Sequence, residues 1–171
     1  MNADARATGD RLAALYREIH RTAMSGVPIC NDALVVEAIG FHNFEGYVLG
    51  VIVTPWFANL VVAPAYTDGS PCLSSSDPWL RLRFPAGDVD FNVSELEGFG
   101  RFASCSLFSP MSEFVNHEAA REAARAALDA LFDPHLHEAW SEKSSARNGA
   151  FDRRALFGGR RRPEPSGEVA P

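Results

Sequence analysis

Residues 34–63 read LVVEAIGFHNFEGYVLGVIVTPWFANLVVA and alternate between short apolar runs and turn-forming residues. The runs are rich in β-branched and aromatic residues, which favour strands over helices. Strands are therefore predicted at 34–41, 46–53 and 60–63. Residues 41–46 resemble a hairpin turn, because Asn and Gly lie between two apolar runs there. Short strands with short connections indicate a mainly antiparallel sheet.

The rest of the chain extends this sheet and adds a helix at each end. Further strands are predicted at 80–84, 89–93 and 102–105, with a second turn at 85–88. Residues 8–24 are predicted to be helical, since large apolar side chains recur there at helical spacing. Residues 116–132 form the second predicted helix, with Asn116 as its N-cap. Its predicted buried face consists of Ala120, Ala124, Ala127, Leu128 and Leu131. The expected fold class is α+β, a mainly antiparallel sheet of about six short strands with an N-terminal and a C-terminal helix packed on it.

The charges divide the chain into an acidic body and a basic tail. Residues 1–143 hold ten basic and nineteen acidic side chains, a net charge of −9, whereas residues 144–171 hold six Arg and three acids, a net charge of +3. The body is the predicted folded domain, and the Arg/Gly/Pro-rich tail is predicted to be flexible because it has too few apolar residues to form a core. An acidic body argues against nucleic acid and favours a basic polypeptide partner.

The expected compartment is the cytoplasm. No apolar run approaches the ~18–20 residues of a membrane helix, so no direct membrane insertion is expected. The residues after Met1 also lack the basic and then apolar order of an export signal. The cysteines, Cys30, Cys72 and Cys105, are far apart and odd in number, which indicates reduced thiols rather than a disulfide framework.

Signatures of catalysis and of metal binding are weak. The chain has no CxxC, no HExxH and no zinc-finger spacing. None of its histidines has the neighbours that a cysteine hydrolase requires. His135 and His137 could chelate a metal or simply be solvated, and Asp88 and Asp90 could act as an acid–base pair or simply face solvent. We therefore expect no enzyme, no metal site and no cofactor.

Two proline turns carry neighbouring large apolar side chains. Residues 54–59 read TPWFAN and residues 105–111 read CSLFSPM. Neighbouring strand residues point to opposite faces of a sheet, so Trp56 and Phe57 cannot both enter one core, and the same holds for Leu107 and Phe108. Either each turn folds over an edge of the core, or the two turns build an exposed apolar groove that binds a partner.

The turns belong to a set of distinctive segments. These are Cys30-Asn31, Glu45-Gly46 followed by Leu49-Gly50, and residues 54–60 (TPWFANL), 84–87 (FPAG) and 105–111 (CSLFSPM). They resemble the signature segments of the HybE family of [NiFe]-hydrogenase assembly chaperones, over about residues 8–157. Residues 153–157, RRALF, resemble the ending of the HupJ and HoxT branch of that family. This sequence departs from the family at Ala58, where Met is expected, and it lacks the rubredoxin-like CxxC module of some relatives.

The resemblance implies an accessory chaperone that catalyses nothing itself. Such a chaperone would hold the precursor small subunit of a [NiFe]-hydrogenase, with its twin-arginine signal peptide, or the large subunit, or both, before export, alongside other maturation proteins. The client-binding residues that it favours are Pro55, Trp56, Phe57, Asn59, Leu107, Phe108 and Pro110. Cys30 and Cys105 could form a shared thiol site, or each could be buried and inert. The alternative function is a thiol- or metal-handling factor that protects or delivers iron during hydrogenase assembly.

The basic tail contains one further resemblance. Residues 152–158, DRRALFG, place two arginines before two large apolar residues, an order similar to the twin-arginine motif of an exported protein. The segment cannot act as an export signal, because it lies at the wrong end and no apolar region follows. It is either part of a solubilising tail, or a mimic in which Arg153, Arg154, Leu156 and Phe157 dock on the domain until a client displaces them.

Overall fold

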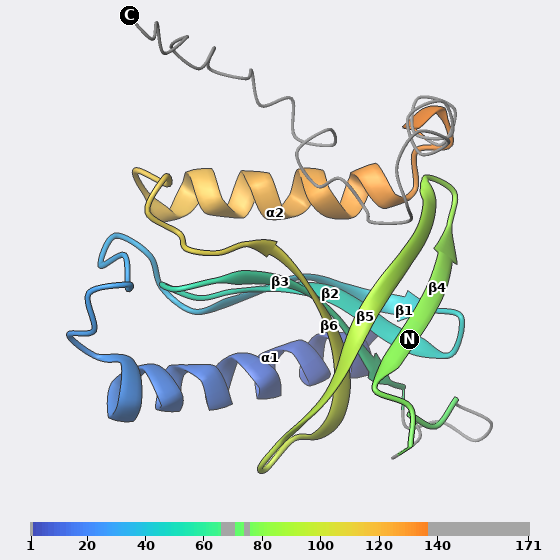
Figure 1. The fold of residues 1–171 in the computed structure, drawn as a ribbon, viewed down its shortest axis with the longest axis horizontal. Helices are drawn as coiled ribbons and strands as arrows, with labels where there is room; N and C mark the ends of the chain where they lie inside the picture. Colours follow the sequence, from blue (N-terminus) through green and yellow to red (C-terminus); the bar gives the residue numbers. More distant parts are fainter. Residues whose placement is uncertain (1, 66–70, 74–75, 137–171) are drawn as a thin grey trace, which may run out of the picture.

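A six-stranded antiparallel sheet lies between two helices that cover opposite faces (Figure 1). The computed structural model describes residues 2–65, 71–73 and 76–136. Along the chain the elements are α1 (Asn2–Ile19), the π-helix η1 (His20–Met24), β1 (Glu37–Phe44), β2 (Tyr47–Val53), β3 (Ala58–Pro64), β4 (Trp79–Phe84), β5 (Gly87–Leu96), β6 (Gly100–Phe108) and α2 (His117–Leu131). The strand order is β1-β2-β3-β6-β5-β4. The predicted α+β class, with an N-terminal and a C-terminal helix on the sheet, is confirmed.

Tight turns set the register of the two outer hairpins. Phe44 pairs with Tyr47, so only Glu45 and Gly46 connect β1 to β2, with φ angles of 48° and 82°. Two consecutive positive φ angles are the requirement of the two-residue hairpin turn that matches the twist of the strands. Phe84 pairs with Gly87 in the same way, which leaves two residues between β4 and β5. Both predicted turns are therefore present.

The core has two parts, one on each side of the sheet. Strand β2 separates them, and all seven of its residues are buried. Among them, Ile52 belongs to the cluster on the α1 side. Leu49 and Val51 belong to the cluster on the α2 side. A strand that is covered on both faces has no polar alternation, which explains why β2 is the most apolar strand of the sequence.

The two helices bury the faces that their periodicity indicates. Helix α2 buries the predicted set Ala120, Ala124, Ala127, Leu128 and Leu131. Its N-cap is Asn116, whose side chain accepts a hydrogen bond of 2.9 Å from the backbone N–H of Ala119. Helix α1 begins at Asn2, earlier than predicted, because the small buried residues Ala5 and Gly9 carry little periodic signal. Residues 20–24 continue as the π-helix η1.

Several strands have different bounds from those predicted. Strand β5 extends to Leu96, because its exposed polar residues alternate with buried ones and still pair with β6. Strand β1 begins at Glu37 rather than Leu34, since residues 31–36 are held in a loop by contacts described below. Within the described residues no helix is long and apolar enough to cross a membrane. The predicted tail, 144–171, lies outside the described residues.

Candidate functional site

The first proline turn, residues 54–57, is held in one conformation by the fully buried Thr54. Its Oγ1 accepts hydrogen bonds from the backbone N–H groups of Trp56, at 3.3 Å, and Phe57, at 3.0 Å. The same hydroxyl donates to the carbonyl of Phe57 at 3.0 Å. A hydroxyl offers one donor and two acceptor positions, so all three are occupied. The indole of Trp56 is therefore presented on a rigid turn.

Trp56 lies half-buried over the C-terminal end of α1. Its ring centroid is 6.4 Å from that of Tyr16, 5.8 Å from that of His20 and 5.5 Å from that of Phe57. Tyr16 and Phe57 also meet edge to face at 5.3 Å. Burial raises the pKa of the Tyr16 hydroxyl, so this phenol stays neutral. Aromatic pairs of this kind contribute about 0.5–1.5 kcal/mol each beyond burial, so the indole is fixed from one side while part of it stays exposed.

Asn31 joins the first turn to two other loops. Its backbone N–H donates to the carbonyl of Pro55 at 2.8 Å. Its side-chain Nδ2 donates to the carbonyls of Met111, at 3.0 Å, and Phe114, at 2.7 Å, and its Oδ1 accepts from the N–H of Ala33 at 3.0 Å. One residue, through its backbone and its side chain, therefore links residues 25–36, residues 54–57 and residues 109–116 into a single end of the molecule.

The second proline turn lies next to the first, because Phe108 at the end of β6 pairs with Ala58 at the start of β3. Met111 is fully buried, and Phe108 packs edge to face on Phe114 with centroids 5.2 Å apart. The bond between Ser109 and Pro110 is cis. The two turns thus share one edge of the sheet, as two neighbouring corners.

The expected single apolar groove between the two turns is not what the structure shows. Trp56 and Phe57 pack toward α1, whereas Leu107 and Phe108 pack into the cluster on the α2 side. The sheet therefore separates the two pairs. Within each pair, however, both neighbours pack on the same side, so the prediction that they cannot share one core is wrong. Residues 54–57 form a turn rather than a strand, and the register of β3 with β6 shifts at Leu107, so simple alternation fails at both places.

The predicted binding residues differ widely in exposure. Pro55 and Leu107 are buried and shape the surface from beneath. The half-buried ones are Trp56, Phe57, Asn59 and Phe108, and Pro110 is exposed. The Oδ1 atom of Asn59 is buried and has no hydrogen-bond partner among the described residues. Their role in binding stays a prediction.

Three exposed aliphatic residues at this end, which sequence reasoning missed, form what we call the loop-end patch. Ile29 is 47% exposed, Val35 58% and Val115 83%. The backbone N–H of Val35 donates to Nδ1 of His117 at 3.3 Å, which places Val35 beside the segment that carries Val115. The exposure of Val35 could have been predicted from the run Leu34-Val35-Val36. In an extended segment alternate side chains point in opposite directions, so burial of the outer two residues turns the middle one outward.

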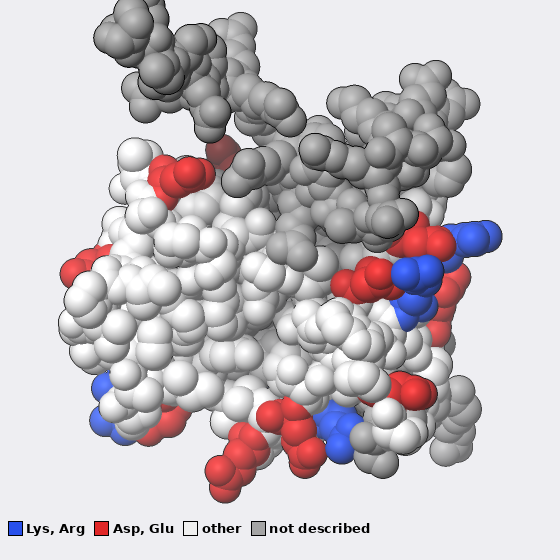
Figure 2. Space-filling model, viewed as in Figure 1, with Lys and Arg blue, Asp and Glu red and all other residues white. Residues whose placement is uncertain are grey.

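Acidic side chains border the loop-end patch. Asp32, Glu113 and Glu118 are exposed on the segments that carry it. In Figure 2 the left side of the molecule, where the loop end lies, is mostly uncharged, with several acidic groups and one basic group at its margin. A surface of this kind attracts a segment that combines apolar with basic side chains.

A charged cluster fixes the start of β1 to the start of α2 behind the patch. The carboxylate of Glu37 lies 2.6 Å from Nε2 of His117 and 3.0 Å from Nε of Arg121, and Arg121 also pairs with Glu118. Because the N–H of Val35 donates to Nδ1 of His117, the imidazole proton sits on Nε2 and is donated to Glu37. Burial alone would raise the pKa of Glu37, but the hydrogen bonds from His117 and Arg121 outweigh it and hold this pKa below its ordinary value.

The two cysteines of the predicted thiol site have different surroundings. Cys30 is half-buried and its Sγ donates to the carbonyl of Met24 at 3.3 Å. Burial, and then the charge of Asp32, raise the pKa of Cys30, so its reactive thiolate is disfavoured. Cys105 is buried in the core cluster on the α2 side. Within residues 2–65, 71–73 and 76–136, no group of three or more His, Cys, Asp or Glu side chains is placed to hold a metal ion.

The acidic strand residues form structural ion pairs. Arg81 on β4 holds Asp90 on β5 at 2.6 Å, and Arg83 holds Asp88 at 3.1 Å. The hydrogen bond from Arg81 lowers the pKa of Asp90, as expected for an acid that stays ionised rather than one that exchanges protons. These pairs cross between neighbouring strands on an exposed face. His137 and the tail residues Arg153, Arg154, Leu156 and Phe157 lie outside the described residues.

A solved structure has the same fold as this chain. The solution structure of HybE from Escherichia coli superimposes with a TM-score of 0.59 at 23% sequence identity, covering 95% of this chain and 91% of the other. At that identity the match shows the fold alone. The architecture is therefore that of a small α+β domain in which two helices enclose one antiparallel sheet.

The sequence comparisons identify the family. Residues 7–159 match the family model described as "[NiFe]-hydrogenase assembly, chaperone, HybE". The chain is 48% identical over 158 residues to the hydrogenase expression/formation protein HupJ of Bradyrhizobium diazoefficiens, covering 92% of this chain and 91% of that protein. It is 38% identical over 149 residues to the hydrogenase expression/formation protein HoxT of Azotobacter vinelandii, covering 86% and 92%. This chain belongs to the HybE family of [NiFe]-hydrogenase assembly chaperones.

Proposed function

We propose that this chain acts in the cytoplasm and holds an incomplete [NiFe]-hydrogenase subunit against the loop-end patch and Trp56. The observation that supports the proposal is that three distinctive segments of the sequence come together in the fold. Segments with the family's distinctive residues, 30–31, 54–57 and 107–111, meet at one end of the sheet through Asn31. The exposed aliphatic side chains of the patch lie on the loops that Asn31 joins.

The size of the patch indicates that Trp56 is needed as an anchor. Full burial of one aliphatic side chain contributes about 1.5–3 kcal/mol, and the patch side chains are already partly covered. Association itself costs about 4–15 kcal/mol in lost translational and rotational freedom. Three aliphatic contacts therefore barely offset this cost. A rigid, partly exposed indole supplies the larger contact area at little further loss of entropy.

The proposed client is the precursor small subunit with its twin-arginine signal peptide, and the large subunit is the second client of the same surface. The acidic border of the patch supports a client segment that is both basic and apolar, which is the character of a signal peptide. The net charge of −9 on residues 1–143 acts in the same direction. Other maturation proteins would meet the complex through the client.

Two tryptophans provide a matched test. Trp56 sits on the rigid turn, whereas Trp79 is 62% exposed on the edge strand β4, away from the loop end. The Trp56→Ala and Trp79→Ala variants would each be produced in cells that make hydrogenase, and co-purified small and large subunits measured. Val35→Ser with Val115→Ser tests the patch itself, because both side chains are exposed and their loss should not disturb folding.

We expect Trp56→Ala and the Val35→Ser, Val115→Ser variant each to reduce co-purified subunit by about tenfold, the effect of losing 1.4 kcal/mol of binding free energy. Trp79→Ala should retain the subunit at the level of the unchanged chain. Circular dichroism establishes that each variant is folded. Folded loop-end variants that retain the full amount of subunit would exclude this surface as the binding site.

A further inference from the structure

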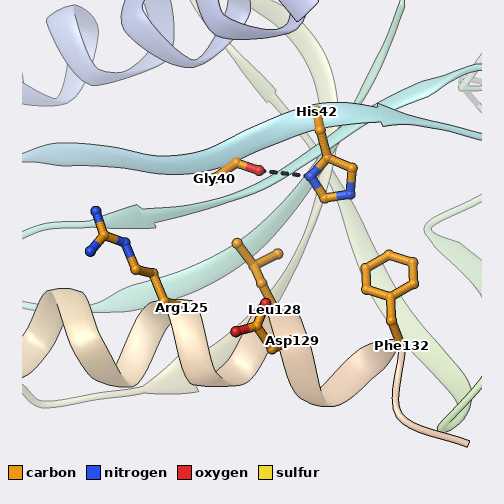
Figure 3. Close-up of a pocket in the computed structure, with 6 residues that line it drawn as sticks. All are labelled: Gly40, His42, Arg125, Leu128, Asp129 and Phe132. Atoms are coloured by element: carbon orange, nitrogen blue, oxygen red, sulfur yellow. Dashed lines mark hydrogen bonds between the residues drawn. The ribbon is translucent and has the colours of Figure 1, made fainter.

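A concave site lies on the other face of the sheet from α1, between β1 and the last turns of α2. Its volume is about 300 Å³, and it is lined by Gly40, His42, Arg125, Leu128, Asp129 and Phe132. Figure 3 shows His42 reaching from β1 toward Phe132 at the end of α2, with Leu128 beside the two rings on the helix. The floor is therefore apolar, and the charged groups stand at the rim.

A bulge in β1 creates this space. The pairing of β1 with β2 shifts register between Ile39 and His42, and Gly40 within the bulge has a φ of 65°. A Cβ atom at Gly40 would lie 2.5 Å from Cδ1 of Leu128, so only glycine fits here. The carbonyl of Gly40 lies 2.7 Å from Nδ1 of His42 and holds that ring over the opening.

Phe132 forms the aromatic wall of the pocket and is itself held from behind. Its ring centroid lies 5.8 Å from that of His42, 5.6 Å from that of Phe44 and 5.9 Å from that of Phe84. It nevertheless remains 38% exposed, next to the cavity. A fixed, partly uncovered aromatic ring beside an empty apolar floor is suited to a large apolar side chain.

The chain itself supplies a segment that fits this site. Phe132 is followed closely by the last described residue, Leu136, and Arg153 lies seventeen residues further on. Seventeen residues of random coil span roughly 20–25 Å on average, so a chain of that length can return to its own starting point. Residues 153–157 carry two arginines and then Leu156 and Phe157. They combine large apolar groups, which match the apolar floor, with charge opposite to that of Asp129.

We propose that residues 153–157 bind in this pocket, with Leu156 and Phe157 against Leu128 and Phe132 and an arginine beside Asp129. The charges give the bound segment a direction. Arg125 stands one helical turn before Asp129 and repels guanidinium groups, so the two arginines lie toward Asp129 and the nearby Asp133. Tethering supplies an effective concentration of order millimolar, so a weak contact is still populated. The proposal stands whether or not the loop-end patch binds a client.

The test uses the full chain in solution. Nuclear magnetic resonance with labelled Leu methyl and Phe ring groups would measure nuclear Overhauser contacts between Phe157 and Leu128. It would also follow the signals of His42 as the sample is diluted. A Leu156→Ser, Phe157→Ser variant removes the apolar pair, and Val169→Ser is its control in the same tail. Asp129→Lys changes the rim of the pocket, and Glu122→Lys makes the same charge change on an exposed position of α2 that does not line the pocket.

We expect contacts between Phe157 and Leu128 that persist on dilution and are retained in Val169→Ser. The signals of His42 should shift in the Leu156→Ser, Phe157→Ser variant, because the apolar pair leaves the pocket, but not in Val169→Ser. Asp129→Lys should lower the ratio of bound to free tail about threefold or more, while Glu122→Lys leaves it nearly unchanged. The proposal is overturned if no such contact exists, or if the contact is lost on dilution and is therefore intermolecular. Equal effects of Asp129→Lys and Glu122→Lys would also overturn it.

Discussion

Replacing Asn31 by alanine should disconnect residues 109–116 from the other two loops of the loop end. Its side chain supplies the hydrogen bonds to the carbonyls of Met111 and Phe114, and it accepts the N–H of Ala33. All three bonds are lost in Asn31→Ala, although the backbone bond from residue 31 to Pro55 can remain. The change therefore removes the connection without removing a large apolar side chain from the core.

The magnitude follows from the number and burial of these bonds. Each net hydrogen bond contributes about 0.5–1.5 kcal/mol, and a buried group left unpaired costs about 1–3 kcal/mol. The donors to Met111 and Phe114 lie in partly buried surroundings, whereas the N–H of Ala33 is exposed to water. We therefore expect Asn31→Ala to lower the free energy of unfolding by about 2–4 kcal/mol.

Asn31→Asp separates hydrogen bonding from side-chain size. Aspartate has nearly the same shape and can still accept the N–H of Ala33, but it places a second oxygen against the carbonyls of Met111 and Phe114. It should therefore destabilise the protein at least as much as alanine does at neutral pH. Asn92→Ala, at an exposed position on β5, is the matched amide control and should cost about 0.5 kcal/mol or less.

Urea unfolding followed by far-ultraviolet circular dichroism measures these free energies. The slope with urea should be the same in all variants, because the surface exposed on unfolding hardly changes. If Asn31→Ala costs no more than Asn92→Ala, or if Asn31→Asp is as stable as the unchanged chain, then Asn31 does not hold the loops together.

Two further predictions concern the ion cluster around Glu37 and the packing of Phe41 on β1 against Gly50 on β2. Glu37 has a lowered pKa in the folded state, so its contribution to stability is complete above its unfolded pKa and is lost as the pH falls. Glu37→Gln should therefore make the free energy of unfolding depend less on pH between about pH 5 and pH 3. Urea titrations across this range check it, and parallel profiles for the two proteins would contradict the assignment. A Cβ atom at Gly50 would lie 2.3 Å from the ring of Phe41, so Gly50→Ala should cost about 1–3 kcal/mol and Phe41→Leu should recover part of it in the double variant. Simple additivity of the two changes in a double-mutant cycle would contradict this packing.

The fold was largely predictable because its helices and turns are specified by local features, namely apolar spacing, capping residues and turn-forming residues. The apolar spacing of residues 116–132 identified every buried residue of α2, and the Asn at 116 identified its cap. The turn at Glu45 and Gly46 was recognisable from its residue types. The start of α1 was missed, since Ala5 and Gly9 are buried through close packing rather than through large apolar side chains. The length of β5 was also missed, because one of its faces is polar and only pairing with β6 keeps it extended.

The candidate site was less accessible to sequence reasoning. Strand alternation predicted that neither Trp56 with Phe57 nor Leu107 with Phe108 could share one core, whereas each pair packs on one side, and the two pairs lie across the sheet from each other. That outcome depends on the register of β3 with β6, which places Phe108 beside Ala58. The exposed Val115 has no periodic signal of its own, since it lies in an irregular segment just before a helix cap.

The sequence alone determined the α+β class, the two helices, the turns and the family. Each of these depends on the spacing of apolar residues within one element or on a short contiguous motif. Only the tertiary structure decided which segments meet. Asn31 bonds to residues eighty or more positions away, and Glu37 to His117 across a similar distance in the chain. Periodicity reports whether a residue is buried within its own element, whereas contact between distant elements depends on strand order and register. For that reason the loop-end patch and the pocket beside α2 became visible only in three dimensions.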